Sequence, residues 1–108
     1  MENEFASLYE TVLDRYNNPE EGSYTSYLFS KGEKKILKKV GEECTEVVVA
    51  SLSEAKEDLI NEFGDLFYHL MVLMVQKGIT LEEVEAELNR RSGKKHNLKA
   101  ERKPVTQY

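Results

Sequence analysis

The sequence predicts an all-α fold, an antiparallel bundle of about four to five helices. Apolar residues recur at spacings of three and four along most of the 108 residues, as on one face of a helix. No segment sustains the strict alternation of apolar and polar residues that is typical of a half-buried strand. Asparagine, proline and glycine separate the helical stretches. These observations favour helices packed against one another over a sheet.

The first three expected helices lie in the N-terminal half of the chain. An amphipathic helix over 2–16 ends before Pro19, because proline cannot continue the hydrogen-bond ladder. A short helix is expected over 24–30, and a long one over 33–52. Gly41 inside the long helix costs about 1 kcal/mol relative to alanine, and it would allow close approach of another helix or a ligand.

Two further helices are predicted from their end signals. Ser53 is the expected N-cap of a helix that ends at Gly78, a residue type common just after a helix. Thr80, with Glu83 three residues later, forms a full capping box at the start of the last helix. That helix is expected to end near 92–93.

The length fits a single domain over 1–108, with a basic tail from about 94 to 108. The net charge of −5 does not favour nucleic-acid binding. Basic residues nevertheless gather at 31–39 and at 90–103, and acidic residues dominate between them. Such patches suit a metal–polyphosphate ligand, although solvated helix faces give the same pattern.

The sequence also indicates a compartment. Cys44 is the single cysteine, so an internal disulfide is impossible. The acidic N-terminus lacks the residue order of a signal peptide. No apolar run approaches the ~18 residues that a membrane helix needs. We therefore expect a cytoplasmic protein with no membrane segment.

Four carboxylates stand partly on the core-facing stripes of two neighbouring helices. Glu43 falls inside the apolar stripe of its helix, with Glu46 at the edge. Glu62 falls inside the stripe of the next helix, with Asp65 one turn along. Facing carboxylates in a core need a positive charge between them, and all-oxygen ligands favour Mg²⁺, or Mn²⁺ as an alternative. Ordinary surface ion pairs, such as one between Lys39 and Glu43, are the competing interpretation.

Other metal centres fit less well. A di-iron bundle needs Glu-x-x-His motifs on two helices, and none occurs. Zinc is disfavoured because Cys44 stands alone and one of the two histidines, His96, lies in the basic tail. Walker-type and dinucleotide-binding glycine motifs are absent as well.

The segment 42–46, followed fifteen residues later by 62–65, resembles the E-E-x-x-E … E-x-x-D signature of the all-α nucleotide pyrophosphohydrolases, the MazG-like superfamily. Within it, the chain resembles the phosphoribosyl-ATP pyrophosphatase family over about residues 5–95. The closer match is carried by segments 23–28, 31–32, 36–43, 65–70 and 88–91. Cys44 departs from the small residue, such as alanine, that the family pattern leads us to expect.

The resemblance implies Mg²⁺-dependent hydrolysis of phosphoribosyl-ATP to phosphoribosyl-AMP and pyrophosphate, the second step of histidine biosynthesis. It further implies a set of metal ligands, namely Glu43, Glu46, Glu62 and Asp65. Glu42 would assist or orient the attacking water, so that the catalytic carboxylates are Glu42, Glu43 and Glu46.

Basic and aromatic side chains give the remaining candidates. The candidates for phosphate contacts are Lys31, Lys35, Lys39 and Arg91. His69, one turn after Asp65, is expected to hydrogen-bond that carboxylate and fix its orientation. Three rings can stack on adenine or simply pack between helices: Tyr24, Tyr27 and Phe29.

The stretch 63–75 is apolar almost all round, which implies burial on more than one face. We therefore expect a homodimer or a higher homo-oligomer, which the resemblance supports. Two other functions remain open. One is a housekeeping pyrophosphohydrolase of nucleoside triphosphates with the same carboxylates. The other is a non-enzymatic helical dimerisation module, which would leave the core-facing carboxylates unexplained.

Overall fold

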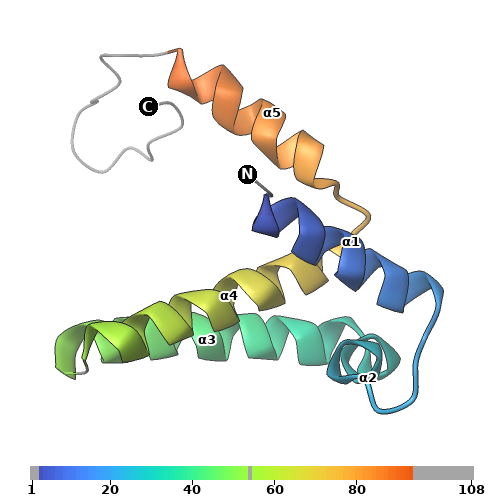
Figure 1. Cartoon of the computed structure of the whole chain (residues 1–108), viewed down its shortest axis with the longest axis horizontal. Coiled ribbons are helices and arrows are strands. Elements are labelled where there is room, and N and C mark those ends of the chain that lie inside the picture. The colour runs from blue at the N-terminus through green and yellow to red at the C-terminus, as the bar shows by residue number, and fades with distance from the viewer. Residues whose placement is uncertain (1–2, 54, 94–108) are drawn as a thin grey trace. The chain divides into compact units, whose positions relative to one another are not determined.

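The computed structural model describes residues 3–53 and 55–93. These residues form five helices and no strand, which confirms the predicted all-α class (Figure 1). The helices are α1 (Glu4–Asn17), α2 (Tyr24–Lys31), α3 (Glu33–Ser53), α4 (Lys56–Gln76) and α5 (Leu81–Ser92). The predicted basic tail, 94–108, lies outside the described residues.

The described residues divide into two compact units, one up to Gly78 and one from Ile79 onwards, and each is described by itself. The first unit contains α1 to α4. The second contains α5. The single-domain organisation remains a prediction.

Helices α3 and α4 form the centre of the first unit. They run side by side in opposite directions, as Figure 1 shows. Ile36 and Ala50 of α3 are buried, as are Val72 and Val75 of α4. These residues recur at helical spacing along each helix, so burying one stripe of each accounts for the pairing.

The junction between α3 and α4 differs from the prediction. Ser53 is the last residue of α3, and its hydroxyl donates to the main-chain oxygen of Val49 at 3.3 Å. Ala55 is the N-cap of α4 and makes no side-chain cap bond. The assignment of Ser53 as an N-cap was therefore wrong. A serine hydroxyl can bond the carbonyl four residues back just as it can cap the next helix, and here the first option prevails.

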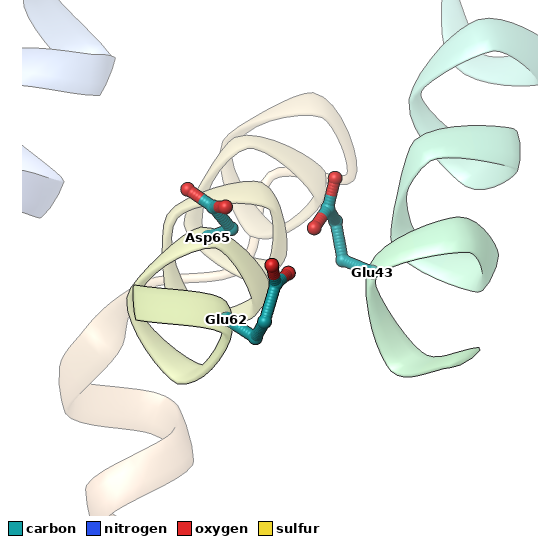
Figure 2. Close-up of side chains that lie close together, drawn as sticks. All are labelled: Glu43, Glu62 and Asp65. Carbon is teal, nitrogen blue, oxygen red and sulfur yellow. The ribbon is translucent and has the colours of Figure 1, made fainter. Parts of the chain in front are cut away.

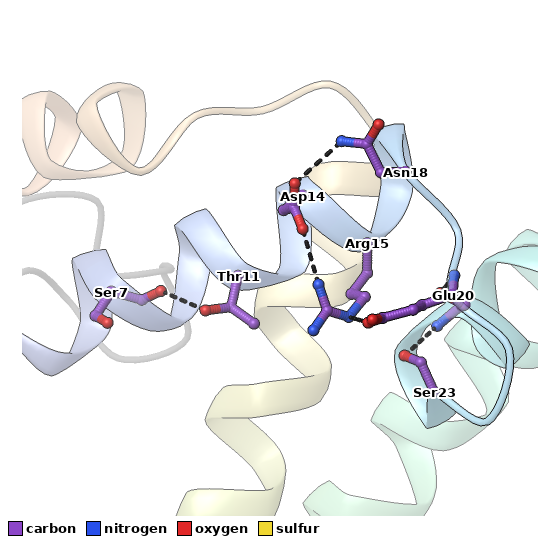
Figure 3. Close-up of polar contacts among 8 residues, drawn as sticks. Ser7, Thr11, Asp14, Arg15, Asn18, Glu20 and Ser23 are labelled. Carbon is purple, nitrogen blue, oxygen red and sulfur yellow. Dashed lines mark hydrogen bonds and ion pairs between the residues drawn. The ribbon is translucent and has the colours of Figure 1, made fainter.

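Helix α2 is held at the end of the α3–α4 pair by its caps and by the preceding loop. Arg15 of α1 pairs with Glu20 of the loop at 2.8 Å (Figure 3). The Ser23 N–H donates to the Glu20 carbonyl at 3.1 Å. The Ser23 hydroxyl then accepts from the main-chain N–H of Ser26. The helix ends at Gly32, whose φ of +92° favours glycine.

The second unit begins with the predicted capping box. The main-chain N–H of Glu83 donates to the Thr80 hydroxyl at 3.1 Å, and the Thr80 N–H donates to the Glu83 carboxylate at 2.9 Å. At the other end of α5, Arg90 and Arg91 hold the Glu87 carboxylate. Hydrogen bonds from Arg90 and Arg91 lower the pKa of Glu87 to about 2. Among the described helices, none has the length and apolar character needed to cross a membrane.

Candidate metal and substrate site

Three carboxylates from two helices converge in the first unit. Figure 2 shows Glu43 of α3 facing Glu62 and Asp65 of α4. One oxygen from each lies within 4.8 Å of the other two. Glu43 is buried, with 9% of its surface exposed, and Glu62 and Asp65 are half-buried. We call these three residues the acid cluster.

The sequence brings these carboxylates together through helical periodicity. Glu43 lies seven residues after Ile36 and seven before Ala50, and both of these residues are buried. Seven residues are close to two helical turns, so Glu43 belongs to the stripe that α3 presents to α4. Glu62 and Asp65 are three residues apart and therefore share one face of α4.

The acid cluster has the chemistry of a site for a hard divalent cation. Like charges this close repel, and burial weakens the screening by water. Lys39 lies beside the cluster, with its Nζ 3.6 Å from Oε1 of Glu43. Their oxygens suit Mg²⁺ or Mn²⁺, since hard cations prefer carboxylate ligands.

The other two predicted carboxylates lie beside the cluster rather than in it. Glu42 and Glu46 are both exposed on α3. Neither belongs to the group of described residues whose oxygens converge. Their roles in catalysis and, for Glu46, in metal binding remain predictions.

The predicted phosphate-binding residues are divided between the two units. Lys39 is beside the acid cluster, and Lys35, half-buried, lies one turn earlier on α3. Lys31 ends α2, where its ammonium stands 5.7 Å from the centre of the Tyr27 ring. Arg91 lies on α5 in the second unit and pairs with Glu87 at 2.8 Å.

His69 is buried next to the acid cluster, but it does not contact a carboxylate in the way predicted. Its Nδ1 lies 2.7 Å from the main-chain oxygen of Asp65, and its Nε2 lies 3.3 Å from the Tyr24 hydroxyl. The predicted bond to the Asp65 side chain was wrong, because an imidazole four residues on reaches the helix carbonyl behind it. A carbonyl only accepts, so Nδ1 carries the proton and Nε2 accepts from Tyr24.

A second hydrogen bond beside this one joins α2 to α4. The Thr25 and Tyr68 hydroxyls bond each other. Burial raises the pKa of Tyr68, and the bond from Thr25 acts in the opposite direction. Sequence reasoning did not assign a role to Thr25 or Tyr68. The available signal was the run of hydroxyl-bearing residues at 23–27, at the start of a short helix. Such a helix must dock on a neighbouring element, and its hydroxyls are the groups that can bond to that element.

The fold and the acid cluster agree with the class that the sequence pattern resembles, the all-α nucleotide pyrophosphohydrolases. The family model described as phosphoribosyl-ATP pyrophosphohydrolase matches residues 5–92. The chain therefore belongs to the phosphoribosyl-ATP pyrophosphohydrolase family.

Relatives of similar length carry a closely related name. The chain is 57% identical to a phosphoribosyl-ATP pyrophosphatase of Clostridium acetobutylicum, over 93% of this chain and 91% of that protein. It is 55% identical to that of Bacillus thuringiensis, over 87% and 88% of the two chains. It is 54% identical to that of Streptococcus thermophilus, over 94% and 97%.

Proposed function

We propose that this protein hydrolyses phosphoribosyl-ATP to phosphoribosyl-AMP and pyrophosphate, the second step of histidine biosynthesis, with Mg²⁺ as its cofactor. Membership of the family supports the reaction and the substrate. The observation that carries the metal-dependent part is the convergence of Glu43, Glu62 and Asp65 within 4.8 Å. A binding module without catalysis would have no use for three converging carboxylates in a partly buried position.

Within this proposal, Glu43, Glu62 and Asp65 hold the cation, and Glu46 adds a ligand from the next turn of α3. Mn²⁺ fits the same oxygen donors. A bound divalent ion would neutralise the polyphosphate and lower the pKa of a water molecule. A carboxylate at the edge of the site, Glu42 or Glu46, would accept the proton of the attacking water.

The lysines of α2 and α3 serve the phosphates in this proposal. Lys39, beside Glu43, would contact the phosphate nearest the cation. Lys35 and Lys31 come successively earlier along the chain and would contact phosphates further from it. Arg91 is a further candidate, since a guanidinium can bind a phosphate in bidentate fashion.

The active form would be a homodimer or a higher homo-oligomer in the cytoplasm, binding neither nucleic acid nor membrane. Large apolar side chains are exposed on both helices of the central pair, including Val48, Leu52, Ile60 and Phe63. Leu52 alone is 83% exposed. Exposed apolar surface of this kind is typical of an interface. The exposed free thiol of Cys44 suits a reducing compartment.

Pyrophosphate release tests the proposed reaction. Phosphoribosyl-ATP with Mg²⁺ is compared with a panel of ordinary and deoxynucleoside triphosphates. We expect selective turnover of phosphoribosyl-ATP that is lost in Glu43→Gln and kept in Glu57→Gln, which changes an exposed carboxylate in the first turn of α4. Turnover of a triphosphate in place of phosphoribosyl-ATP would assign the protein to the housekeeping branch. No turnover of any nucleotide would favour the dimerisation module.

A further inference from the structure

Three tyrosine rings stack in the first unit, close to the acid cluster. The ring centre of Tyr24 lies 6.2 Å from that of Tyr68, with 30° between the ring planes. It lies 6.1 Å from that of Tyr27, with 24° between the planes. Tyr68 belongs to α4 and the other two belong to α2. We call these three rings the tyrosine stack.

Two rings of this stack, those of Tyr24 and Tyr27, remain partly exposed. Tyr24 is 47% exposed and Tyr27 is 43% exposed. Phe29, the third aromatic residue of α2, behaves differently, because it packs edge-on against Tyr16 of α1 at 4.9 Å. Phe29 is therefore a packing residue. Tyr24 and Tyr27 present aromatic surface to the solvent.

The Lys31 ammonium shows that a cation can reach the Tyr27 ring, since it lies 5.7 Å from the ring centre. The interaction of an exposed lysine with an exposed ring is weak, so a planar ligand can displace it. The same lysine could then contact a phosphate of that ligand.

An open hollow of about 330 Å³ borders the Tyr27 ring. Its lining includes the hydroxyls of Ser23, Ser26 and Ser30. The Ser23 and Ser26 hydroxyls accept main-chain N–H groups and the Ser30 hydroxyl donates to a carbonyl. Each hydroxyl thus keeps further hydrogen-bonding capacity. The volume lies in the range of small-molecule sites, and an aromatic face beside spare donors and acceptors suits a nucleobase.

The tyrosine stack is fixed relative to the acid cluster. The Tyr24 hydroxyl bonds His69, and His69 bonds the main chain of Asp65, one helical turn away along α4. One turn is ~5.4 Å. Tyr24 and Tyr27 add two steps of about 6 Å beyond His69, 6.0 Å from ring to ring at the first and 6.1 Å at the second. A nucleotide whose phosphates lie at the acid cluster can extend its base this far.

We propose that Tyr27 forms the platform on which the adenine of the substrate stacks, with Tyr24 supporting its ring and the hollow beside Tyr27 receiving the edge of the base. This inference rests on the proposed function for the identity of the base. The platform is held in place before the ligand arrives, which reduces the entropy lost on binding. It separates recognition of the base from recognition of the polyphosphate.

The direct test compares two ligands that differ only in the base. Binding of AMP and of ribose 5-phosphate is measured by calorimetry, without added metal, for the wild type, Tyr27→Leu and Tyr27→Phe. We expect the wild type to bind AMP more tightly than ribose 5-phosphate. Tyr27→Leu should weaken AMP binding about tenfold, the effect of losing one base–aromatic stack. Tyr27→Phe keeps the ring and should keep the affinity.

The outcomes that overturn the platform are equally clear. They are equal affinity of the wild type for the two ligands, unchanged AMP binding in Tyr27→Leu, or equal losses in Tyr27→Leu and Tyr27→Phe. Ribose 5-phosphate serves as the internal control, because its affinity should be the same in all three proteins. A fall in both affinities would indicate a structural role for Tyr27.

Turnover then separates failure of the platform from failure of the proposed function. In Tyr27→Leu the KM for phosphoribosyl-ATP should rise about tenfold with little change in kcat, because stacking stabilises the bound substrate and the transition state alike. Loss of kcat with unchanged KM would overturn the platform. Absence of wild-type turnover would overturn the proposed reaction, while the AMP comparison would still decide the platform.

Discussion

Two polar regions lie next to each other on α4, and they are built on opposite principles. The first is the hydroxyl–histidine network of Tyr24, Thr25, Tyr68 and His69, where each hydrogen bond joins a donor to an acceptor. The second is the acid cluster of Glu43, Glu62 and Asp65, where like charges converge. The network is satisfied within the chain and holds α2 in place. The convergence of three carboxylates opposes folding through repulsion and favours binding of a cation.

The largest expected effect comes from breaking the acid cluster. Glu62→Gln should lower turnover at least about a hundredfold, because even residues that merely support metal ligands cost 10–100-fold when changed. Without metal, the same change should stabilise the fold. Two charges roughly 4 Å apart repel by about 1 kcal/mol even in water, and about 1 kcal/mol shifts the melting temperature of a small domain by roughly 4–8 °C.

Thermal melts with and without Mg²⁺ check this prediction. Mg²⁺ should raise the melting temperature of the wild type and of Glu57→Gln, since a ligand that binds the folded state stabilises it. It should leave that of Glu62→Gln nearly unchanged. A magnesium-induced rise of equal size in Glu62→Gln would mean that the cation binds elsewhere.

A smaller effect is expected from breaking the network. Tyr24→Phe removes the hydroxyl that bonds His69, while the ring remains. His69 is only 5% exposed, so its Nε2 would lose a partner in a place that water reaches poorly. We expect a loss of about 1–3 kcal/mol in the free energy of unfolding, measured by urea denaturation.

Tyr27→Phe is the matched control for this loss. It makes the same chemical change on an exposed ring of the same helix, and its effect on stability should stay within about 0.5 kcal/mol. Equal losses in the two variants would show that the bond to His69 contributes little.

The hydrogen bond between Thr25 and Tyr68 is expected to affect mainly the pKa of Tyr68, and through it the pH dependence of stability. Burial raises the pKa of Tyr68, and the Thr25 hydroxyl opposes this shift. Thr25→Val should therefore raise the pKa further, as followed by tyrosinate absorption. Because the folded-state pKa lies above the unfolded value of 10.0, its contribution to stability is present below about pH 10 and is lost as the pH rises through the folded value. A lower pKa in Thr25→Val would contradict the assignment.

The smallest effect belongs to Glu87, a carboxylate that pairs with two arginines of its own helix. Arg90 and Arg91 lower its pKa to about 2 from an ordinary value of 4.5. A depressed pKa stabilises the folded form above about pH 4.5, and this contribution is lost as the pH falls towards 2. The site is exposed, so the change should be slight.

Carboxyl carbon shifts measured by NMR during an acid titration check this last prediction. In Arg90→Gln the pKa of Glu87 should move back towards 4.5, since the bond from Arg90 is the largest cause of its shift. An unchanged pKa in that variant would mean that Arg91 alone holds the carboxylate.

The acid cluster could be predicted from sequence because helical periodicity fixes which residues share a face. Glu43 lies on the same helical face as the buried Ile36 and Ala50, and this follows from the spacing along the sequence alone. The all-α class and the capping box at Thr80 followed from equally local rules.

The parts that could not be predicted depend on contacts between distant segments or on a choice between nearly equal bonds. The side-chain partner of His69 is Tyr24, 45 residues earlier, and helical periodicity does not predict contacts between different helices. The Ser53 hydroxyl could donate to the carbonyl four residues back or accept from a main-chain N–H of the next helix. The neighbouring sequence does not decide between these two bonds, and the structure has the first. The convergence of only three of the four predicted ligands depends on the rotation of α3, which periodicity gives only to within a residue or so.

The separation of contacts along the chain also has a kinetic consequence. The acid cluster spans residues 43–65 of one helical hairpin, whereas α2 docks on α4 through bonds between residues 45 and 43 positions apart. Contacts that are close in sequence form sooner, because they close shorter loops. We therefore expect substitutions in the α3–α4 core to slow folding, and those at Tyr24 or Thr25 mainly to speed unfolding. A folding chain would then become able to hold a cation before it can hold a base.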